Sequence, residues 1–407
     1  MRILFVADGR SPIALNWMRY FIAAGHEVHL VSSFPCHPEP GLASFTIVTV
    51  ALSEVKTTTA GSGAGGNDRF LRRVLPVGLR TKVRQWLGPL TLPRAARKLR
   101  RSIQAVQPDL VHAMRIPYEG MLATLALHGM STPLLVSVWG NDFTLHAPST
   151  PLMRYYTRLA LRQASALHTD CQRDLRLAQD WGFDLSKPAI VLPGGGGIQM
   201  DVFYPAQEAP DQPPLVLNPR GLRAYVRSDT IFQAIKLVHA QRPEVRFACT
   251  GMAGQTEALR WVDALGLSGA VALLAPLSRD DMAALFRQAQ VMLSITTHDG
   301  TPNTLLEGLA SGCFPIAGDL PSIREWITSG VNGLLVDPGD PQVLAQAMLQ
   351  ALDQPDLRAK ARQINLDLVR ERAEYGRVMG QAEIFYPQIA QINADYTLGK
   401  TAETQRR

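Results

Sequence analysis

The run DGTPNTLLEGLASG (residues 299–312) lies between two apolar segments that predict buried strands. The first of these strands is expected to end at Ile295, and a helix is expected from about residue 303 to residue 310. Asn303 and Thr304 are suited to cap that helix, whose exposed amides and dipole would attract a diphosphate. The run therefore predicts a strand, a loop and a helix that together bind phosphate.

Two carboxylates in this run have the chemistry to bind a sugar. Asp299 lies in the loop at the carboxyl end of the strand, and Glu307 lies one turn into the helix on the same side. A carboxylate in such a place accepts hydrogen bonds from hydroxyl groups, which is how ribose is commonly held. The alternative is an ordinary strand, loop and helix with two solvated acids. The order of the motif and of the text that follows it favours the binding site.

Short β-rich runs alternate with amphipathic helical patterns on both sides of this motif, which predicts parallel sheets built from βαβ units. The expected strands of the first half are ILFVA, VHLVS, DLVHA, LLVSV, ALHTD and AIVLP, and those of the second half are LVLNP, VRFACT, AVALLA, VMLSI, CFPIAG and GLLVD. From about Pro341 onward the pattern is helical only. ADGRSP follows the first strand in place of GxGxxG, which argues against a dinucleotide-dependent dehydrogenase.

A glycine- and proline-rich stretch divides the two series of strands. We therefore expect four parts along the chain, with a ligand cleft between two Rossmann-like domains at the carboxyl ends of their strands. They are residues 1–193, which would bind the acceptor; a linker, 194–213; residues 214–380, which would bind the nucleotide; and a C-terminal helix, 381–407, packed on the first domain.

The composition is that of a soluble globular protein, with 407 residues, 46% of them hydrophobic and 19% charged. The sequence starts on a strand pattern without signal-peptide features, and no apolar run approaches the roughly 20 residues that cross a bilayer. The four cysteines are scattered, so neither a disulfide framework nor a metal site is indicated. These features predict a cytoplasmic protein.

The net charge of +6 comes from one segment. Residues 69–101 contain eleven basic residues and no acidic one, interleaved with apolar residues such as Trp86 and Leu90. A basic amphipathic stretch of this kind is typical of a protein that attaches peripherally to an anionic membrane, here at its inner face. A solvated helical face is the alternative, and nucleic-acid binding is not expected because no recognisable module is present. The run GSGAGGND before it, residues 61–68, predicts a mobile loop.

The stretch from residue 294 to residue 340 resembles the signature of the group 1 family of retaining glycosyltransferases with the GT-B fold, and the resemblance extends over nearly the whole chain. That family carries an acidic residue, seven further residues and a Glu, matched here by Asp299 and Glu307. The resemblance implies that Glu307 binds the ribose of the donor nucleotide and that Asp299 binds the donor hexose. It also implies that backbone amides bind the hexose and phosphates, namely those of Gly300, Thr301, Asn303 and Thr304. In two places the sequence departs from the family, since the first Glu is replaced by Asp299 and the usual second glycine by Pro302, which has no amide hydrogen.

The resemblance also implies two cations on the donor diphosphate, where they would stabilise the leaving group. Arg220 matches the first, and Arg227 is the candidate for the second, with Arg223 as the alternative. Arginines that merely face water are the other interpretation of this loop. Gly197, in the run GGGGIQMDVFYP, would let the backbone approach the donor closely, although a hinge without ligand contact fits the same glycines.

Three residues of the first domain are candidates by position. Gly9 lies where the family has a glycine-rich loop next to the donor phosphates. Trp139 stands where many relatives have a His, so Asp142 becomes the polar group expected nearest the acceptor. His112 is a reserve candidate, with a hydrogen-bonded core histidine as the favoured interpretation.

The resemblance therefore implies a metal-independent, retaining transfer of a hexose from a UDP- or GDP-sugar, without a further cofactor, to a glycan or lipid-linked acceptor in the synthesis of a cell-surface polysaccharide or glycolipid. Departure of the nucleoside diphosphate and attack of the acceptor from the same face would give retention. The alternatives are a nucleotide-sugar epimerase or phosphorylase of the same fold and a non-catalytic nucleotide-binding scaffold. The pair Asp299 and Glu307 argues against the first two.

Overall fold

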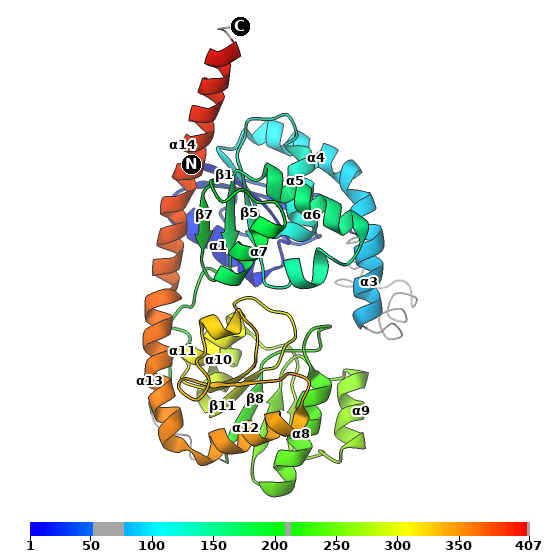
Figure 1. Ribbon diagram of the computed structural model, residues 1–407, viewed down its shortest axis with the longest axis vertical. Coiled ribbons are helices and arrows are strands. Elements are labelled where there is room, and N and C mark those ends of the chain that lie inside the picture. The colour runs from blue at the N-terminus through cyan, green and yellow to red at the C-terminus, as the bar shows by residue number, and fades with distance from the viewer. Residues whose placement is uncertain (52–76, 208–212, 405–407) are drawn as a thin grey trace. The chain divides into compact units, whose positions relative to one another are not determined.

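The computed structural model describes residues 1–51, 77–207 and 213–404, and it divides them into two compact units (Figure 1). Unit 1 comprises Met1–Gly196 together with the C-terminal residues from Val378, and unit 2 comprises Gly197–Arg377. The loop predicted at residues 61–68, and residues 69–76 of the basic segment, lie outside the described residues.

Unit 1 is built on a parallel sheet of seven strands in the order β3-β2-β1-β4-β5-β6-β7. The strands are β1 (Arg2–Ala7), β2 (Glu27–Ser32), β3 (Ser44–Ile47), β4 (Leu110–Ala113), β5 (Leu134–Val138), β6 (Ala166–Thr169) and β7 (Ala189–Val191). The helices are α1 (Pro12–Ala23), α3 (Val77–Leu87), the 3₁₀ turn η2 (Gly88–Thr91), α4 (Leu92–Val106), the π turn η3 (Ile116–Gly120), α5 (Met121–Ala126), the π turn η4 (Asp142–His146), α6 (Pro151–Gln163) and α7 (Gln172–Asp180). The strands β4, β5 and β6 are buried along their whole length because helices cover both faces of the sheet.

Unit 2 is built on a parallel sheet of six strands in the order β10-β9-β8-β11-β12-β13. The strands are β8 (Leu215–Asn218), β9 (Arg246–Cys249), β10 (Val271–Leu273), β11 (Val291–Ser294), β12 (Phe314–Gly318) and β13 (Leu334–Val336). The helices are α8 (Ser228–Gln241), α9 (Thr256–Ala264), α10 (Arg279–Gln288), α11 (Asn303–Ala310), the 3₁₀ turn η5 (Ile323–Glu325), α12 (Pro341–Asp353) and α13 (Pro355–Arg372).

The predicted βαβ organisation is confirmed, and each of the twelve expected strands is present. Among the strands of the described residues, the sequence missed only β3, a short edge strand whose residues are mostly exposed and which therefore lacks an apolar run. In both sheets the strand order reverses once, between β1 and β4 in unit 1 and between β8 and β11 in unit 2. Ligands of open parallel sheets bind outside the carboxyl ends of the strands at such a reversal.

The last helix, α14 (Tyr375–Thr404), packs on unit 1 although it follows unit 2 in the sequence. The Tyr386 hydroxyl and His112 Nδ1 form a hydrogen bond of 2.6 Å, and the Tyr386 ring stacks on Phe21 with 4.5 Å between centroids. His112 Nε2 bonds to the Ser137 hydroxyl at 2.7 Å, and burial lowers the pKa of this histidine well below its usual value. His112 is therefore a core histidine with both nitrogens hydrogen-bonded, as the favoured interpretation of the sequence had it.

Within the part of the chain that the structure describes, no helix combines the length and the apolar character that crossing a bilayer requires.

Candidate functional site

The loops that follow β8 and β11 lie side by side at the strand-order reversal of unit 2. Val226 and Thr296 form an antiparallel bridge, and the Thr297 amide donates to the Tyr225 carbonyl at 2.9 Å. These pairings join residues about seventy positions apart and place the two loops that sequence analysis selected at one end of the sheet.

Arg220 and Asp299 form an ion pair where these loops meet. Their side chains are only 11% and 15% exposed, so the pair is shielded from water on most sides. Arg220 is also oriented by Tyr225, whose hydroxyl accepts from Nη2 at 3.4 Å and whose ring centroid lies 5.5 Å from the guanidinium carbon. Arg220 and Asp299 are thus one charge pair in this structure.

Helix α11 begins at Asn303, as expected, but its cap differs from the expectation. The residue at the cap position is Pro302, and no side chain caps the helix, so the prediction that Asn303 and Thr304 cap it is wrong. The amides of Leu305 and Leu306 donate to the Pro302 carbonyl. For the amides of Asn303 and Thr304, no hydrogen bond is found among the described residues. They remain donors at the positive end of the helix dipole, which is the arrangement that binds phosphate.

The loop from Asp299 to Pro302 is held by a segment that the sequence did not single out. Ser322 Oγ donates to the Asp299 carbonyl at 2.7 Å, and Trp326 Nε1 donates to Thr301 Oγ1 at 3.0 Å. Both come from the turn around η5, more than twenty residues further along the chain. Thr301 is buried together with Gly300, so its hydroxyl orients the loop.

Glu307 is partly buried on α11, and burial raises the pKa of its carboxyl group from 4.5 to about 7. The positive charge of Arg279 on α10 opposes this shift. Next to it, Gly308 lets α11 lie directly on β11, because a Cβ there would come within 2.4 Å of Met292 Sδ. Glu307 is therefore held one helical turn from the helix start with a carboxyl group that changes charge near neutral pH.

Arg227 lies at the start of α8, and its amide donates to the Ile295 carbonyl at 3.0 Å. Its guanidinium pairs with Asp229 through two hydrogen bonds of 2.9 and 2.8 Å. Arg223, the alternative second cation, is exposed. Arg227 thus lies beside the end of β11 with its guanidinium engaged by its own helix.

The two candidate glycines are each required by contacts within their own unit. Gly197 has a φ of +92°, and a Cβ there would come within 2.7 Å of the Ala373 carbonyl oxygen. Gly9 donates its amide to Ser32 Oγ at 3.0 Å, and a Cβ there would come within 2.6 Å of Cys36 Sγ. Backbone packing is sufficient to explain both glycines.

The structure corrects the expectation for Asp142. Its side chain is fully buried, with one oxygen accepting from Arg115 Nε at 2.9 Å and the other from the Trp139 amide at 3.1 Å. Burial raises the pKa of its carboxyl group, against the opposing effect of Arg115. Asp142 therefore turns inward and positions Arg115, which is 29% exposed and was missed because nothing in the sequence marks it.

A buried group of possible metal ligands follows β6 in unit 1. It consists of Asp170, Cys171 and Asp174, whose ligand atoms lie within 4.8 Å of one another. Their spacing would suit a metal ion, which the sequence did not indicate. Arg173 donates twice to Asp174, at 2.9 and 2.7 Å, and its positive charge opposes a second cation there.

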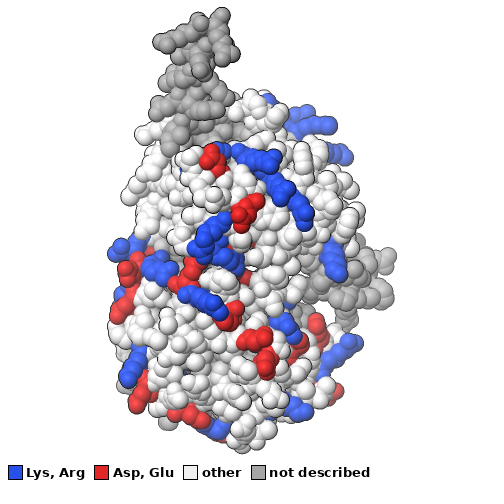
Figure 2. Space-filling model, in the orientation of Figure 1, with Lys and Arg blue, Asp and Glu red and all other residues white. Residues whose placement is uncertain are grey.

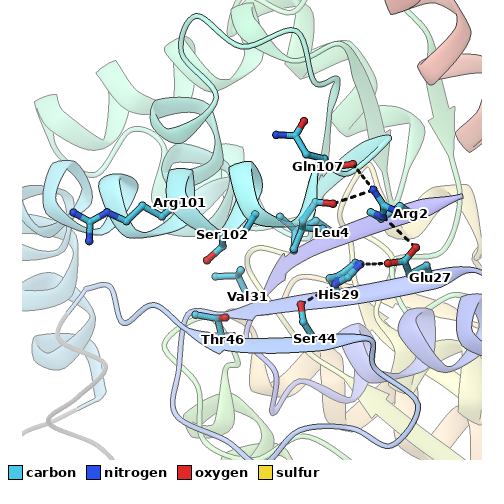
Figure 3. A pocket seen from close by; sticks show the side chains of 12 residues that line it. Arg2, Leu4, Glu27, His29, Val31, Ser44, Thr46, Arg101, Ser102 and Gln107 are labelled. Carbon is cyan, nitrogen blue, oxygen red and sulfur yellow. Dashed lines mark hydrogen bonds and ion pairs between the residues drawn. The ribbon is translucent and has the colours of Figure 1, made fainter.

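A cavity of about 670 Å³ lies elsewhere in unit 1, between α4 and one face of β1, β2 and β3 (Figure 3). Its polar groups bond to one another: Arg2 Nε donates to Glu27 at 3.1 Å, and His29 lies 3.2 Å from Glu27 and 2.7 Å from the Ser44 hydroxyl. None of the candidate residues of the donor or acceptor site lines this cavity.

Two family models match the chain. Residues 201–365 match the model described as glycosyl transferases group 1, and residues 9–194 match the glycosyl transferase 4-like domain. The two matches are consecutive and together cover most of both units.

Among curated proteins, the D-inositol 3-phosphate glycosyltransferase of Thermobispora bispora is 25% identical over 44% of this chain, and the match spans 46% of that relative's own length. The putative glycosyltransferase EpsD of Bacillus subtilis is 24% identical over 71% of this chain and 79% of its own.

Two solved structures share the fold at low sequence identity. The sucrose-phosphate synthase of Thermosynechococcus elongatus has a TM-score of 0.74 at 15% identity, covering 96% of this chain and 99% of its own. HepE of Anabaena, solved in complex with UDP-glucose, has a TM-score of 0.69 at 15% identity, covering 97% of this chain and 100% of its own.

Proposed function

Because the chain belongs to the group 1 glycosyltransferases and has the GT-B fold of two Rossmann-like domains, we propose that it transfers a hexose from a UDP- or GDP-sugar to a glycan or lipid-linked acceptor. The observation that carries the proposal is the meeting of Arg220 and Asp299 at the strand-order reversal of unit 2, beside the start of α11. A nucleotide sugar requires a cation, a carboxylate and amide donors, and this place offers all three. The two amides have no hydrogen-bond partner among the described residues.

In this proposal the parts of the donor bind to different groups of unit 2. Glu307 accepts hydrogen bonds from the ribose hydroxyls, and Asp299 accepts them from the hexose. The amides of Asn303 and Thr304 bind the diphosphate at the helix start, with those of Gly300 and Thr301 beside them. Pro302 interrupts this row of amides because it has no hydrogen to donate.

The chemistry that we propose depends on charge neutralisation. As the bond between the hexose and the diphosphate breaks, negative charge accumulates on the leaving phosphate, and Arg220 stabilises it. Arg227 would add a second positive charge after leaving Asp229 for the diphosphate. The acceptor hydroxyl attacks from the face that the diphosphate leaves, and the leaving phosphate takes its proton. This route retains the anomeric configuration and needs no metal ion.

A thermal-shift screen of nucleoside diphosphates tests the donor site. We expect UDP or GDP to raise the melting temperature of the wild-type protein, since a ligand that binds only the folded state stabilises it by mass action. The Glu307→Ala variant should lose most of this rise, whereas Glu257→Ala, on the exposed face of α9, should keep it. An unchanged response in Glu307→Ala would show that the site is misassigned, and NMR of the product's anomeric carbon tests retention.

The described part of the basic segment supports a peripheral attachment to the cytoplasmic face of an anionic membrane, where a lipid-linked precursor of a polysaccharide or glycolipid would be found. Val83, Trp86, Leu87 and Leu90 are 42%, 61%, 47% and 63% exposed on α3 and η2. Exposed basic residues extend this surface along α4, namely Arg94, Arg97, Lys98 and Arg101. At the upper right of Figure 2, where Figure 1 places α4, Lys and Arg side chains have no acidic side chain beside them. An apolar patch beside basic charge is the surface that anionic lipid binds.

Vesicle sedimentation tests this attachment. We expect the protein to sediment with vesicles that contain anionic lipid and to remain in solution with neutral ones. The double variant Trp86→Ser and Leu90→Ser should lose binding, and so should Arg94→Gln with Arg97→Gln. The control, Lys236→Gln with Lys360→Gln, removes two exposed charges of unit 2. If the control binds as weakly as the α4 variant, overall charge accounts for the attraction and the surface is wrong.

A further inference from the structure

The carboxyl edge of the sheet in unit 1 collects arginine side chains at the reversal of its strand order. Arg10 follows β1, and Arg115 follows β4, the neighbouring strand on the other side of the reversal. Arg84 reaches the same edge from α3, since its guanidinium carbon lies 5.1 Å from the ring centroid of Phe34, which follows β2. On the proposed function, this edge belongs to the domain that binds the acceptor.

Arg84 is held by aromatic rings instead of by a carboxylate. Its guanidinium carbon lies 4.5 Å from the ring centroid of Tyr118, in addition to its contact with Phe34. Among the described residues, no carboxylate pairs with Arg84, and its buried Nε has no hydrogen-bond partner. The face of an aromatic ring attracts a cation without neutralising it, so the guanidinium donors remain available to an anion.

A second guanidinium lies over the same ring. The guanidinium carbon of Arg10 is 4.0 Å from the centroid of Phe34, and Arg10 pairs with Asp8 through hydrogen bonds of 2.9 and 2.8 Å. Two guanidinium groups therefore lie near one ring, and Asp8 pairs with one of them. Like charges near one ring repel each other, and an anion bound to both would relieve the repulsion.

The carboxyl group of Glu119 interacts electrostatically with Arg84, but it is buried and hydrogen-bonded to another residue. Glu119 accepts a hydrogen bond of 2.5 Å from the Ser33 hydroxyl. Burial raises the pKa of Glu119, against the opposing effects of Ser33 and Arg84. Glu119 is therefore hydrogen-bonded to Ser33 and makes no ion pair with Arg84 among the described residues.

Tyr118 adopts an unusual backbone conformation to take part in this arrangement. Its φ is 72° and its ψ is −57°, in a region that residues other than glycine rarely occupy. The Tyr118 hydroxyl donates to the Arg84 carbonyl at 2.8 Å, and its ring fills the space above Gly88, where a Cβ would come within 2.6 Å. Tyr118 thus fixes the end of α3 and places the Arg84 side chain over the Tyr118 ring.

We propose that Arg84 and Arg10 bind a phosphate group of the acceptor, so that this transferase acts on a phosphorylated acceptor. A phosphate monoester carries up to two negative charges and three acceptor oxygens, which match two guanidinium groups with forked donors. The inference rests on the proposed function for the identity of the acceptor domain. The phosphate belongs either to a soluble sugar phosphate or to a lipid phosphate. The apolar side chains of Val83 and Trp86, exposed on the same helix, can contact the chain of a lipid.

Calorimetric titration tests the proposal with two phosphate probes, glucose 6-phosphate and octyl phosphate, against glucose and octyl glucoside. The titrations contain saturating UDP, which occupies the cations of unit 2. We expect both phosphate probes to bind the wild-type protein and the unphosphorylated ones to bind at least about tenfold more weakly, because a hydrogen bond to a charged group is strong. Tighter binding of octyl phosphate would identify a lipid phosphate, and tighter binding of glucose 6-phosphate a soluble one.

The variants are Arg84→Gln, Arg84→Lys and the control Arg154→Gln, which removes an exposed charge from α6 in the same unit. Phosphate binding should weaken about tenfold or more in Arg84→Gln, by an intermediate factor in Arg84→Lys, and less than twofold in Arg154→Gln. If Arg84→Gln does not fold, Arg84→Lys carries the comparison. Equal weakening in Arg84→Gln and Arg154→Gln, or no binding of either phosphate probe, would overturn the proposal. Binding of UDP and of GDP, measured in parallel, separates the two ideas, since the absence of both in the wild-type protein overturns the proposed function itself.

Discussion

At the scale of single residues, the site in unit 2 is organised by one ion pair. Arg220 and Asp299 come from loops after different strands and are mostly buried together. A donor diphosphate has to compete with the Asp299 carboxylate for Arg220, and the donor hexose has to compete with Arg220 for Asp299. The ion pair therefore holds both side chains in place until the donor binds. In the proposed complex, Arg220 then contacts the diphosphate and Asp299 contacts the hexose.

Asp299→Asn distinguishes the two tasks. We expect UDP to bind a few-fold more tightly, because Arg220 loses its competing partner, while turnover falls about tenfold or more as the hexose loses a charged acceptor. Calorimetry with UDP and initial rates with the nucleotide sugar measure the two effects. Weaker binding of UDP in this variant would contradict the assignment, since it would show that Asp299 is needed to hold Arg220 in its binding position.

Glu307 makes stability depend on pH. Its folded-state pKa of about 7 lies above the ordinary value of 4.5, so the folded protein binds this proton more tightly than the unfolded chain does. The stability that the proton contributes is full below pH 4.5 and is lost as the pH rises through 7. Glu307→Gln should therefore gain about 1 to 3 kcal/mol over the wild-type protein between pH 5 and pH 8.5.

Urea unfolding at both pH values measures this difference. The matched control is Glu257→Gln, which changes an exposed glutamate on α9 and should show no such gain. Equal gains in both variants would point to overall charge instead of the buried site. Donor binding should show the opposite trend in the wild-type protein, weakening below pH 7 as Glu307 loses the charge that accepts the ribose hydrogen bonds.

At the scale of elements, α11 sits close to β11 because Gly308 has no side chain. Met292, the residue that a Cβ would meet, is fully buried on β11 and also lies in the core beside Phe286. The closeness sets the height of the helix start above the sheet, and with it the position of the amides of Asn303 and Thr304. The small residue in the middle of this helix is thus required by packing and serves the phosphate site.

Gly308→Val should displace α11. We expect a loss of about 3 kcal/mol in the free energy of unfolding from overpacking, together with weaker UDP binding because the helix start moves. Thr304→Val is the control, since Thr304 is only partly buried and keeps its backbone amide. Chemical denaturation and calorimetry measure both quantities. A destabilised Gly308→Val protein that binds UDP normally would show that the position of the helix does not matter for the diphosphate.

At the scale of the whole molecule, the two units are not two consecutive halves of the chain. The C-terminal helix starts in unit 2 and completes unit 1, where Tyr386 reaches the core histidine His112. The stability of unit 1 thus depends on residues that follow unit 2 in the sequence. The hydrogen bond to His112 is buried, and breaking it leaves a polar group without a partner, which costs about 1 to 3 kcal/mol.

Tyr386→Phe tests this dependence. Hydrogen exchange followed by mass spectrometry should show faster exchange in peptides from residues 1–196 and unchanged exchange in peptides from residues 197–377. Ile384→Ala is the control, because Ile384 lies on the same helix and is 67% exposed. Faster exchange in unit 2 as well would mean that the two units unfold together.

The sequence by itself determined the two parallel sheets, the start and end of α11 and the two loops that carry Arg220 and Asp299. These follow from patterns within about fifteen residues, since the alternation of apolar runs and the positions of glycine and proline act locally. Only the tertiary structure decided that Arg220 pairs with Asp299, that Asp142 turns inward to Arg115, that α14 completes unit 1 and that Arg84 lies between Phe34 and Tyr118. Each of these features depends on how distant segments pack and on which charged groups are removed from water. The local pattern of residues determines neither the packing nor the desolvation.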